Sequence, residues 1–207
     1  MKIIVFGATG TIGQHVIKQA VDDGHQVTAF ARDTTKIELN DPKILKVTGD
    51  VMNPSSIAES ISGHDVVIVV LGAGRKGGVR AVGTRNIINA MKAHDMKRLI
   101  CQSSLGVGDS RINLNFFWKY IMFGLLLRPA YADHELQEQY VRESELDWTI
   151  VRPAAFTDGN RTGEYHHGIL AIEESPLLKI SRADVADFLL KQVSDLRYLH
   201  QSPGLSY

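Results

Sequence analysis

Runs of apolar, β-favouring residues alternate along the chain with stretches in which apolar residues recur every three to four positions. The first pattern is typical of buried strands and the second of amphipathic helices. Their alternation predicts an α/β fold, a doubly wound (Rossmann), mainly parallel sheet covered by helices on both faces. The chain of 207 residues shows no repeat and no linker, so we expect one domain, 1–207, with a small irregular cap.

Six strands and five helices are expected. The strands fall at 2–6, 26–30, 44–47, 65–71, 98–102 and 148–151, and the run at 65–71 is apolar enough to be central. The helices fall at about 12–22, 54–62, 79–94, 133–144 and 181–193. Asn53-Pro54 and Ser181-Arg182-Ala183-Asp184 are capping-type helix starts, and Asp133 is the expected cap of its own helix. Residues 155–174 lack clear periodicity and predict the irregular cap.

The opening stretch KIIVFGATGTIG changes from strand to helix within a few residues. Gly7 permits the turn, Gly10 lets the backbone approach a pyrophosphate, and Gly13 allows close packing of helix and strand. The free N–H groups of the first helical turn then face the phosphates. The turn also contains Thr9, Thr11 and Ile12. The spacing G-x-x-G-x-x-G in this context predicts a nucleotide site, and the alternative is a glycine-rich turn without a ligand.

Glycines and small polar residues recur where the other strands end. In open α/β sheets, ligands bind beyond the carboxyl ends of the strands, so these breaks indicate one cleft. The candidate cofactor contacts at these ends are Asp50, Val51, Leu71, Gly72, Ala73, Ser103 and Pro153.

The end of the second strand favours NADP(H) over NAD. Arg32 stands where an NAD site would have an acidic residue, and Thr35 and Lys36 follow one turn later. A guanidinium can pair two oxygens of a 2′-phosphate, and a lysine adds a second positive charge. Asp33 is the counter-argument, although it can simply orient the arginine. The alternative is a solvated Arg–Asp pair.

With these residues in place, the chain resembles the atypical short-chain dehydrogenase/reductases, and most closely their flavin reductase/biliverdin reductase B type. The resemblance covers almost the whole length and rests on GATGTIG, Ala31-Arg32-Asp33, Gly49-Asp50-Val51, Val69-Val70-Leu71-Gly72, Gly83-Thr84-Arg85-Asn86-Ile87, Ala90-Met91-Lys92-Ala93-His94 and Val141-Arg142-Glu143-Ser144. It implies NADPH-dependent reduction of flavins and linear tetrapyrroles. It also implies a serine beside the nicotinamide, matched by Ser104 or Ser103, and a histidine matched by His134. A further histidine expected after a proline pair is absent from Arg152-Pro153-Ala154-Ala155.

The candidate catalytic residues are Ser104 and His134. No tyrosine is followed four positions later by lysine, so the acid that protonates a carbonyl oxygen in typical short-chain dehydrogenases is missing. Such an acid is worth ~10²–10⁴-fold, so ketone reduction would be handicapped. Hydride transfer to a conjugated ring needs less help. Ser104 can bond the nicotinamide or the acceptor, or merely end a strand. His134 can donate a proton or contact an acidic group, or be a surface residue. No metal site is expected.

Composition limits the partners. Lysine plus arginine equals aspartate plus glutamate, 23 each, so nothing favours nucleic acid. One cysteine, Cys101, and an apolar start too short for a signal peptide lead us to expect a cytoplasmic protein without a transmembrane segment. The apolar run at 116–127 has three interpretations: it roofs the cleft, it forms a dimer contact, or it rests on a membrane surface. We expect a monomer or weak homodimer, and covering segments at about 109–132 and 155–178.

Three functions remain. The first is an NADPH-dependent reductase acting on a planar conjugated acceptor, which is a flavin, a bilin or a quinone. The second is a non-catalytic NADP(H)-binding redox sensor or regulatory protein. The third is an epimerase or a chaperone-like assembly factor on the same fold, because fold alone does not fix function.

Overall fold

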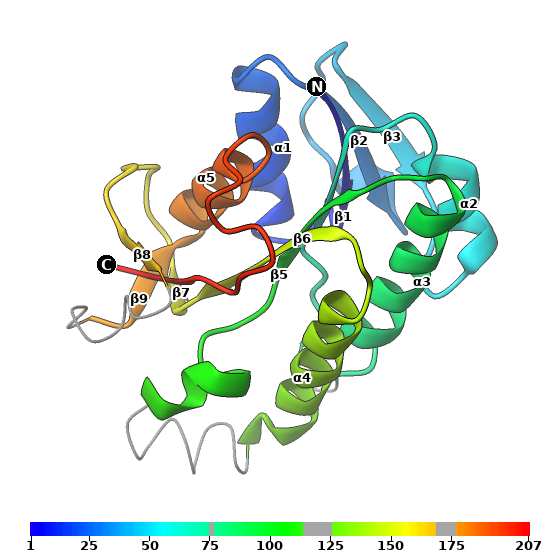
Figure 1. Ribbon diagram of the computed structural model, residues 1–207. Helices are drawn as coiled ribbons and strands as arrows, with labels where there is room; N and C mark the ends of the chain where they lie inside the picture. Colours follow the sequence, from blue (N-terminus) through cyan, green and yellow to red (C-terminus); the bar gives the residue numbers. More distant parts are fainter. Residues whose placement is uncertain (75–76, 114–125, 169–176) are drawn as a thin grey trace.

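The computed structural model describes residues 1–74, 77–113, 126–168 and 177–207. An eight-stranded sheet with the order β3-β2-β1-β4-β5-β6-β10-β8 forms the centre of the molecule (Figure 1). All neighbours pair in parallel except β8, which runs antiparallel to β10. The strands are β1 (Lys2–Phe6), β2 (Gln26–Ala31), β3 (Ile44–Thr48), β4 (Val66–Val69), β5 (Arg98–Gln102), β6 (Asp147–Pro153), β8 (His166–Gly168) and β10 (Gly204–Ser206).

Helices cover both faces of this sheet. α1 (Gly13–Asp22) and α5 (Arg182–Lys191) pack together on one face, and α2 (Pro54–Ile61), α3 (Arg80–Ala93) and α4 (Arg128–Arg142) lie on the other (Figure 1). The alternation of side chains along β1 divides the core accordingly: Ile3 packs on the α1 side and Ile4 on the α2 side. The doubly wound fold predicted from the apolar pattern is therefore confirmed.

The most apolar strand is central, as predicted. β4 lies between β1 and β5, and all four of its residues are fully buried. No helix among the described residues is both long and apolar enough to cross a membrane.

The expected start of α4 is wrong. The helix begins at Arg128, more than one turn before Asp133, because Pro129 occupies its first turn, where a missing backbone N–H costs nothing. Asp133 lies inside the helix and caps a different one, as described below. The other two predicted caps are confirmed: Asn53 accepts from the N–H of Ser55 at 3.1 Å, and Ser181 accepts from the N–H of Asp184 at 3.0 Å.

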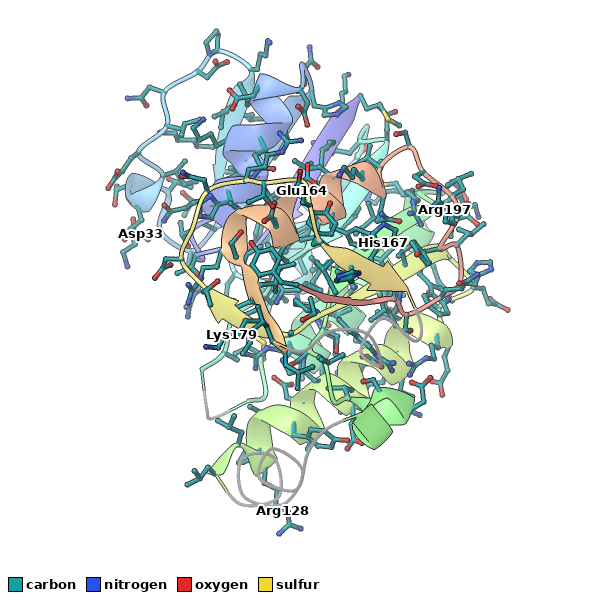
Figure 2. The ribbon with its side chains drawn as sticks, turned by 90° about the vertical axis from the view of Figure 1, so that its left-hand side faces the viewer. Asp33, Arg128, Glu164, His167, Lys179 and Arg197 are labelled. Carbon is teal, nitrogen blue, oxygen red and sulfur yellow. The ribbon has the colours of Figure 1, made fainter. Side chains whose placement is uncertain are left out.

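The expected irregular cap contains short strands. β7 (Ala155–Thr157) pairs with β9 (Lys179–Ser181) in a separate two-stranded sheet, and β8 joins the main sheet. Between β7 and β8 the chain passes over α5, on the face that Figure 2 shows with Glu164 and His167. Two buried carboxylates of α5 hold it there. Asp184 accepts from the N–H groups of Thr162 and Gly163 at 2.8 and 2.9 Å, and Asp187 accepts from Arg161 Nε at 2.7 Å.

Candidate functional site

The glycine turn between β1 and α1 has the close packing that the sequence predicts. Gly7 has φ +95°, and a Cβ there would lie 2.4 Å from the carbonyl oxygen of Val70 on the neighbouring chain segment. A Cβ on Gly13 would lie 2.2 Å from the carbonyl oxygen of Gly7. The N–H of Gly10 closes the turn on the same carbonyl at 2.9 Å. Side chains at these positions would push the helix away from the strand.

This turn leaves donors at the start of α1. The helix has no side-chain cap, and the backbone N–H groups of Thr11, Ile12 and Gly13 donate to no acceptor within the described residues. Unpaired N–H groups at a helix N-terminus form a binding site for phosphate oxygens, and the helix dipole favours the negative charge. A cofactor pyrophosphate therefore fits this turn.

A cavity of about 190 Å³ extends from this turn along the carboxyl ends of β1 to β4. Eight of the predicted cofactor contacts line it: Gly7, Thr9, Gly10, Arg32, Asp50, Val51, Leu71 and Gly72. Sequence reasoning missed Met52, which is 45% exposed at the mouth of this cavity. The mixed apolar and polar lining suits an adenosine group. The remaining predicted contacts lie outside the lining: Thr11, Ile12, Gly13, Thr35, Lys36, Ala73, Ser103 and Pro153.

Arg32 is the cation that this cavity offers. Its side chain is exposed and makes no hydrogen bond or ion pair within the part of the chain that the structure describes. Asp33 does not orient it. Instead, Asp33 accepts from the Thr35 hydroxyl at 2.5 Å and lies 3.6 Å from the ammonium of Lys36. Hydrogen bonds from Thr35 hold the pKa of Asp33 below its usual value. Asp33 therefore engages two of the three predicted phosphate ligands and leaves Arg32 free.

Two serines follow β5 at the same end of the sheet. Ser103 is buried, and its N–H donates to the carbonyl of Val151 in β6 at 2.8 Å. Ser104 is partly exposed, and its hydroxyl donates to the Leu105 carbonyl at 3.3 Å. Because that bond is long and local, the Ser104 hydroxyl can turn to a ligand, whereas the Ser103 hydroxyl faces the protein interior.

His134 lies on α4 beside Arg80, the first residue of α3. Burial, and then the positive charge of Arg80, lower the pKa of His134 to about 4. The imidazole is therefore neutral at pH 7 and offers a hydrogen bond rather than the proton of an imidazolium. His134 is not the surface residue that the sequence left as an alternative.

Sequence reasoning missed a buried ionic cluster at this end of the sheet. Arg152 of β6 is only 2% exposed, and it donates from Nε and Nη2 to both carboxylate oxygens of Glu138 on α4, at 2.9 and 2.8 Å. Its Nη1 donates to Asp109 at 2.6 Å. Although burial acts in the opposite direction, the bonds from Arg152 hold the pKa of Glu138 below its usual value. An arginine within an otherwise apolar strand was the signal that could have revealed the cluster.

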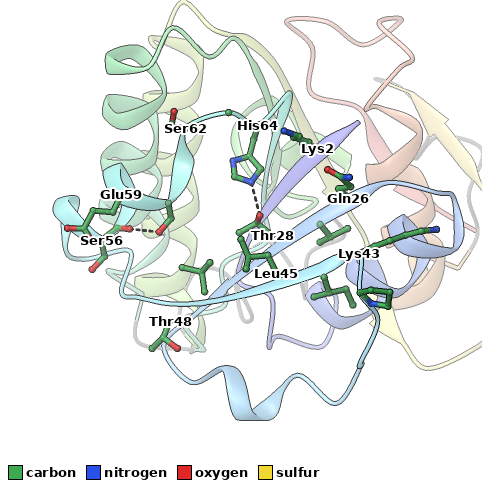
Figure 3. Close-up of a pocket in the computed structure, with 16 residues that line it drawn as sticks. Lys2, Gln26, Thr28, Lys43, Leu45, Thr48, Ser56, Glu59, Ser62 and His64 are labelled. Atoms are coloured by element: carbon green, nitrogen blue, oxygen red, sulfur yellow. Dashed lines mark hydrogen bonds between the residues drawn. The ribbon is translucent and has the colours of Figure 1, made fainter.

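A larger cavity than the one beside the glycine turn lies elsewhere. A hollow of about 940 Å³ is lined by residues of β2, β3 and α2 and of the adjoining loops, among them Gln26, Lys43, Ser62 and His64 (Figure 3). His64 Nδ1 bonds the carbonyl of Ile61 at 2.9 Å, so its Nε2 accepts from the Thr28 hydroxyl at 2.7 Å. The His64 imidazole and the Thr28 hydroxyl thus satisfy each other.

Two further predictions concern segments that lie partly outside the described ranges. The apolar run at 116–127 is described only at 126 and 127, so its three interpretations stay open. Of the covering segment at 155–178, the part at 158–168 packs on α5, and 169–176 is not described. Within the described residues, no group of three or more His, Cys, Asp or Glu side chains is placed to hold a metal ion.

The fold and this cleft define a dinucleotide-binding protein of the Rossmann class. Residues 7–196 match the model of the NAD(P)H-binding family, and the chain belongs to that family. The match begins at Gly7, the first glycine of the turn. The NAD(P)H-binding family that the resemblance predicted is thereby confirmed.

Curated relatives are similar over most of the chain. An uncharacterised chloroplastic protein of Arabidopsis thaliana is 30% identical over 78% of this chain and 61% of its own length. The photosystem II assembly factor Ycf39 of Synechocystis is 26% identical over 93% of this chain and 58% of its own. A 2-alkyl-3-oxoalkanoate reductase of Stenotrophomonas maltophilia is 32% identical over 52% of this chain and 34% of its own. The chain thus spans about three fifths of the length of the first two.

Solved structures share the fold over the full chain. The oxidoreductase ylbE of Lactococcus lactis superposes with a TM-score of 0.84 at 25% identity, covering 100% of this chain and 90% of that one. A Veillonella parvula short-chain dehydrogenase/reductase in complex with NADP gives 0.84 at 19%, covering 100% and 94%. ChuY of Escherichia coli O157:H7, an anaerobilin reductase, gives 0.81 at 24%, covering 100% and 97%. The two less identical structures support the fold alone.

Proposed function

We propose that this protein is an NADPH-dependent reductase that transfers hydride to a planar conjugated acceptor, which is a flavin, a biliverdin-type bilin or a quinone. The observation that carries the proposal is the combination of a nucleotide cleft lined by Arg32 with a sequence in which no tyrosine is followed four positions later by lysine. Similarity to the oxidoreductase ylbE and to an oxoalkanoate reductase supports redox chemistry.

The residues divide into binding and positioning roles. The N–H groups at the start of α1 would hold the pyrophosphate, and Arg32 would pair with the 2′-phosphate. Asp50 and Val51 would contact the adenosine half. When bound, the reduced nicotinamide supplies the hydride. Ser104 would hydrogen-bond the nicotinamide amide or the acceptor, and Pro153 would border the same end.

The acceptor class follows from the proton chemistry. The position four residues after Tyr131 on α4 is Glu135, so no tyrosine–lysine pair is available there. His134 is neutral because burial lowers its pKa to about 4. An acceptor that takes hydride onto a conjugated ring can obtain its proton from water, whereas a ketone needs an acid at its oxygen.

A screen of oxidised acceptors tests the proposal. Purified protein would be mixed with NADPH or NADH and with FMN, biliverdin isomers or small quinones, and absorbance at the nicotinamide band would be followed. Turnover with at least one acceptor, faster with NADPH, is expected. Tight NADPH binding without turnover of any acceptor would contradict it.

One specific similarity favours a second function. The relative Ycf39 is named a photosystem II assembly factor, and it is similar over 93% of this chain. An NADP(H)-binding regulatory protein would bind NADPH and turn over nothing. A partner captured only in the presence of NADPH would support that alternative.

A further inference from the structure

The buried ionic cluster connects two elements of the candidate site. Arg152 holds Glu138 on α4, one turn after His134, and holds Asp109 at the beginning of the 3₁₀ segment Gly108–Asn113. Arg142 also donates to Glu138, at 2.6 Å, so two guanidinium groups face two carboxylates. Asp109 is 75% exposed, whereas the side chains of Arg152 and Glu138 are almost fully buried.

Asp109 ends the turn that contains Ser104. The N–H groups of Ser103 and Leu105 donate to the carbonyls of Val151 and Pro153, at 2.8 and 2.9 Å, so β6 fixes the first half of this turn. The Ser110 hydroxyl closes the second half: it accepts from the N–H of Gly106 at 2.9 Å and donates to the carbonyl of Val107 at 2.7 Å.

The turn is shaped around the guanidinium. Gly108 has φ +58°, and a Cβ there would lie 2.8 Å from Arg152 Nη2. Only glycine both adopts that backbone conformation readily and leaves room for the side chain of Arg152. Buried ion pairs are commonly no more stabilising than apolar residues of the same size, so their advantage lies in fixed geometry. Geometry is what Arg152 provides here, because its planar fork sets the directions of both carboxylates.

We propose that Asp109, Arg152 and Glu138 are positioning residues that hold the Ser104 turn at a fixed place relative to α4 and His134. Asp109 is the exposed end of this cluster. Because Arg152 bonds both Asp109 and Glu138, it fixes the position of Asp109 relative to α4. The inference rests on the proposed reductase function, because the positioned group is the serine that would contact nicotinamide or acceptor. None of the three positioning residues lines the cavity between the glycine turn and Arg32.

Substitution of Asp109 by asparagine tests the proposal, since it keeps the shape and removes the charge. In Asp109→Asn we expect kcat to fall about 10-fold, as a misplaced contact does, while the Kd for NADPH stays within about twofold because Arg32 and the glycine turn are untouched. Asp22→Asn is the matched control. It removes an exposed carboxylate that accepts from Lys18 at 3.0 Å, far along α1, and should change neither value.

The decisive comparison is made in the Ser104→Ala background. If Asp109 acts through Ser104, the same Asp109→Asn change should lower kcat there by less than about twofold. A 10-fold loss in both backgrounds, or no loss in either, would overturn the proposal.

Hydrogen exchange separates this proposal from the proposed function. In Asp109→Asn the amides of residues 104–107 should exchange faster, while those of α1 and α5 are unchanged. If no acceptor is turned over, the proposed reductase function is wrong. The hydrogen-exchange rates then still test whether Asp109 holds the Ser104 turn in place. Equal exchange of 104–107 in both proteins would then overturn it.

Discussion

The carboxylate of Asp133 on α4 caps the helix that begins at Arg80. It accepts from the backbone N–H groups of Arg80 and Ala81 at 3.2 and 3.0 Å, and it lies 3.5 Å from the guanidinium of Arg80. Neither end of α3 has another side-chain cap among the described residues. One buried carboxylate thus satisfies helix donors, balances a buried cation and fixes the relative position of the two helices beside the cleft.

Removal of the Asp133 carboxylate should lower the free energy of unfolding by more than the loss of an ordinary helix cap does. Asp133→Ala leaves the N–H groups of α3 unpaired and Arg80, whose side chain is 12% exposed, without its partner. We expect the free energy of unfolding to fall by about 2–4 kcal/mol in urea denaturation. Asn53→Ala removes a cap without an attached cation and should cost only about 1 kcal/mol. Equal losses in the two variants would show that the Arg80 pair contributes nothing.

The glycine turn yields a second stability prediction. In Gly13→Ala the new methyl group would lie 2.2 Å from a backbone oxygen, so α1 must move. We expect a loss of about 1–3 kcal/mol, the usual cost of overpacking, and weaker NADPH binding. Thermal unfolding with and without NADPH measures both effects. Gly159→Ala is the control, because its nearest neighbour would be 3.4 Å away. A stable Gly13→Ala protein that binds NADPH normally would contradict the role assigned to the turn.

Local signals made much of this fold predictable. The change from strand to helix at GATGTIG depends on residues within ten positions, and the caps at Asn53 and Ser181 are formed by their immediate neighbours. The apolar run of β4 likewise identified a central strand, since only a strand buried on both faces can have that composition.

Long-range relationships were not predictable in this way. Asp133 looked like the cap of its own helix, because a partner at Arg80 is fixed only by tertiary packing. Arg152 and Glu138 are 14 positions apart, and although an arginine in an apolar strand is unusual, no local pattern identifies Glu138 as its partner. Asp33 was expected to affect Arg32, but a short local bond to Thr35 takes its carboxylate away. These are contacts between elements or competing local bonds, which periodicity does not report.

Arg32 should determine which nicotinamide cofactor is preferred. Arg32→Ala removes a guanidinium that is free to pair with a 2′-phosphate. Because hydrogen bonds to charged groups contribute about 1.5–3 kcal/mol, the Kd for NADPH should rise about 10- to 100-fold, while that for NADH stays within about twofold. Titration followed by nicotinamide fluorescence measures both. In Lys36→Ala, whose ammonium already faces Asp33, the change should be below about threefold. Equal weakening of NADPH and NADH in Arg32→Ala would place the 2′-phosphate elsewhere.

The partly buried imidazole of His134 should make the protein sensitive to mild acid. Its pKa is lowered from 6.5 to about 4 in the folded chain. Well above pH 6.5 neither the folded nor the unfolded chain binds this proton, so His134 does not reduce the free energy of unfolding there. As the pH falls from 6.5 towards 4, the unfolded chain takes up a proton that the folded chain does not, and the free energy of unfolding decreases. The loss from this one group should be about 2 kcal/mol between pH 7 and pH 5.

His134→Gln isolates this effect, because glutamine keeps a polar side chain that does not titrate. Burial also lowers the pKa of His25 and His167, so both proteins retain part of the acid sensitivity in the same direction. Carboxylates with lowered pKa, such as Asp187, begin to lose their contribution only below about pH 5, and both proteins have them. Urea denaturation at pH 7 and pH 5 should therefore show a smaller difference in His134→Gln than in the wild type. Identical differences would mean that His134 is protonated to the same extent in the folded and unfolded chains, and its neutral role in the site would have to be abandoned.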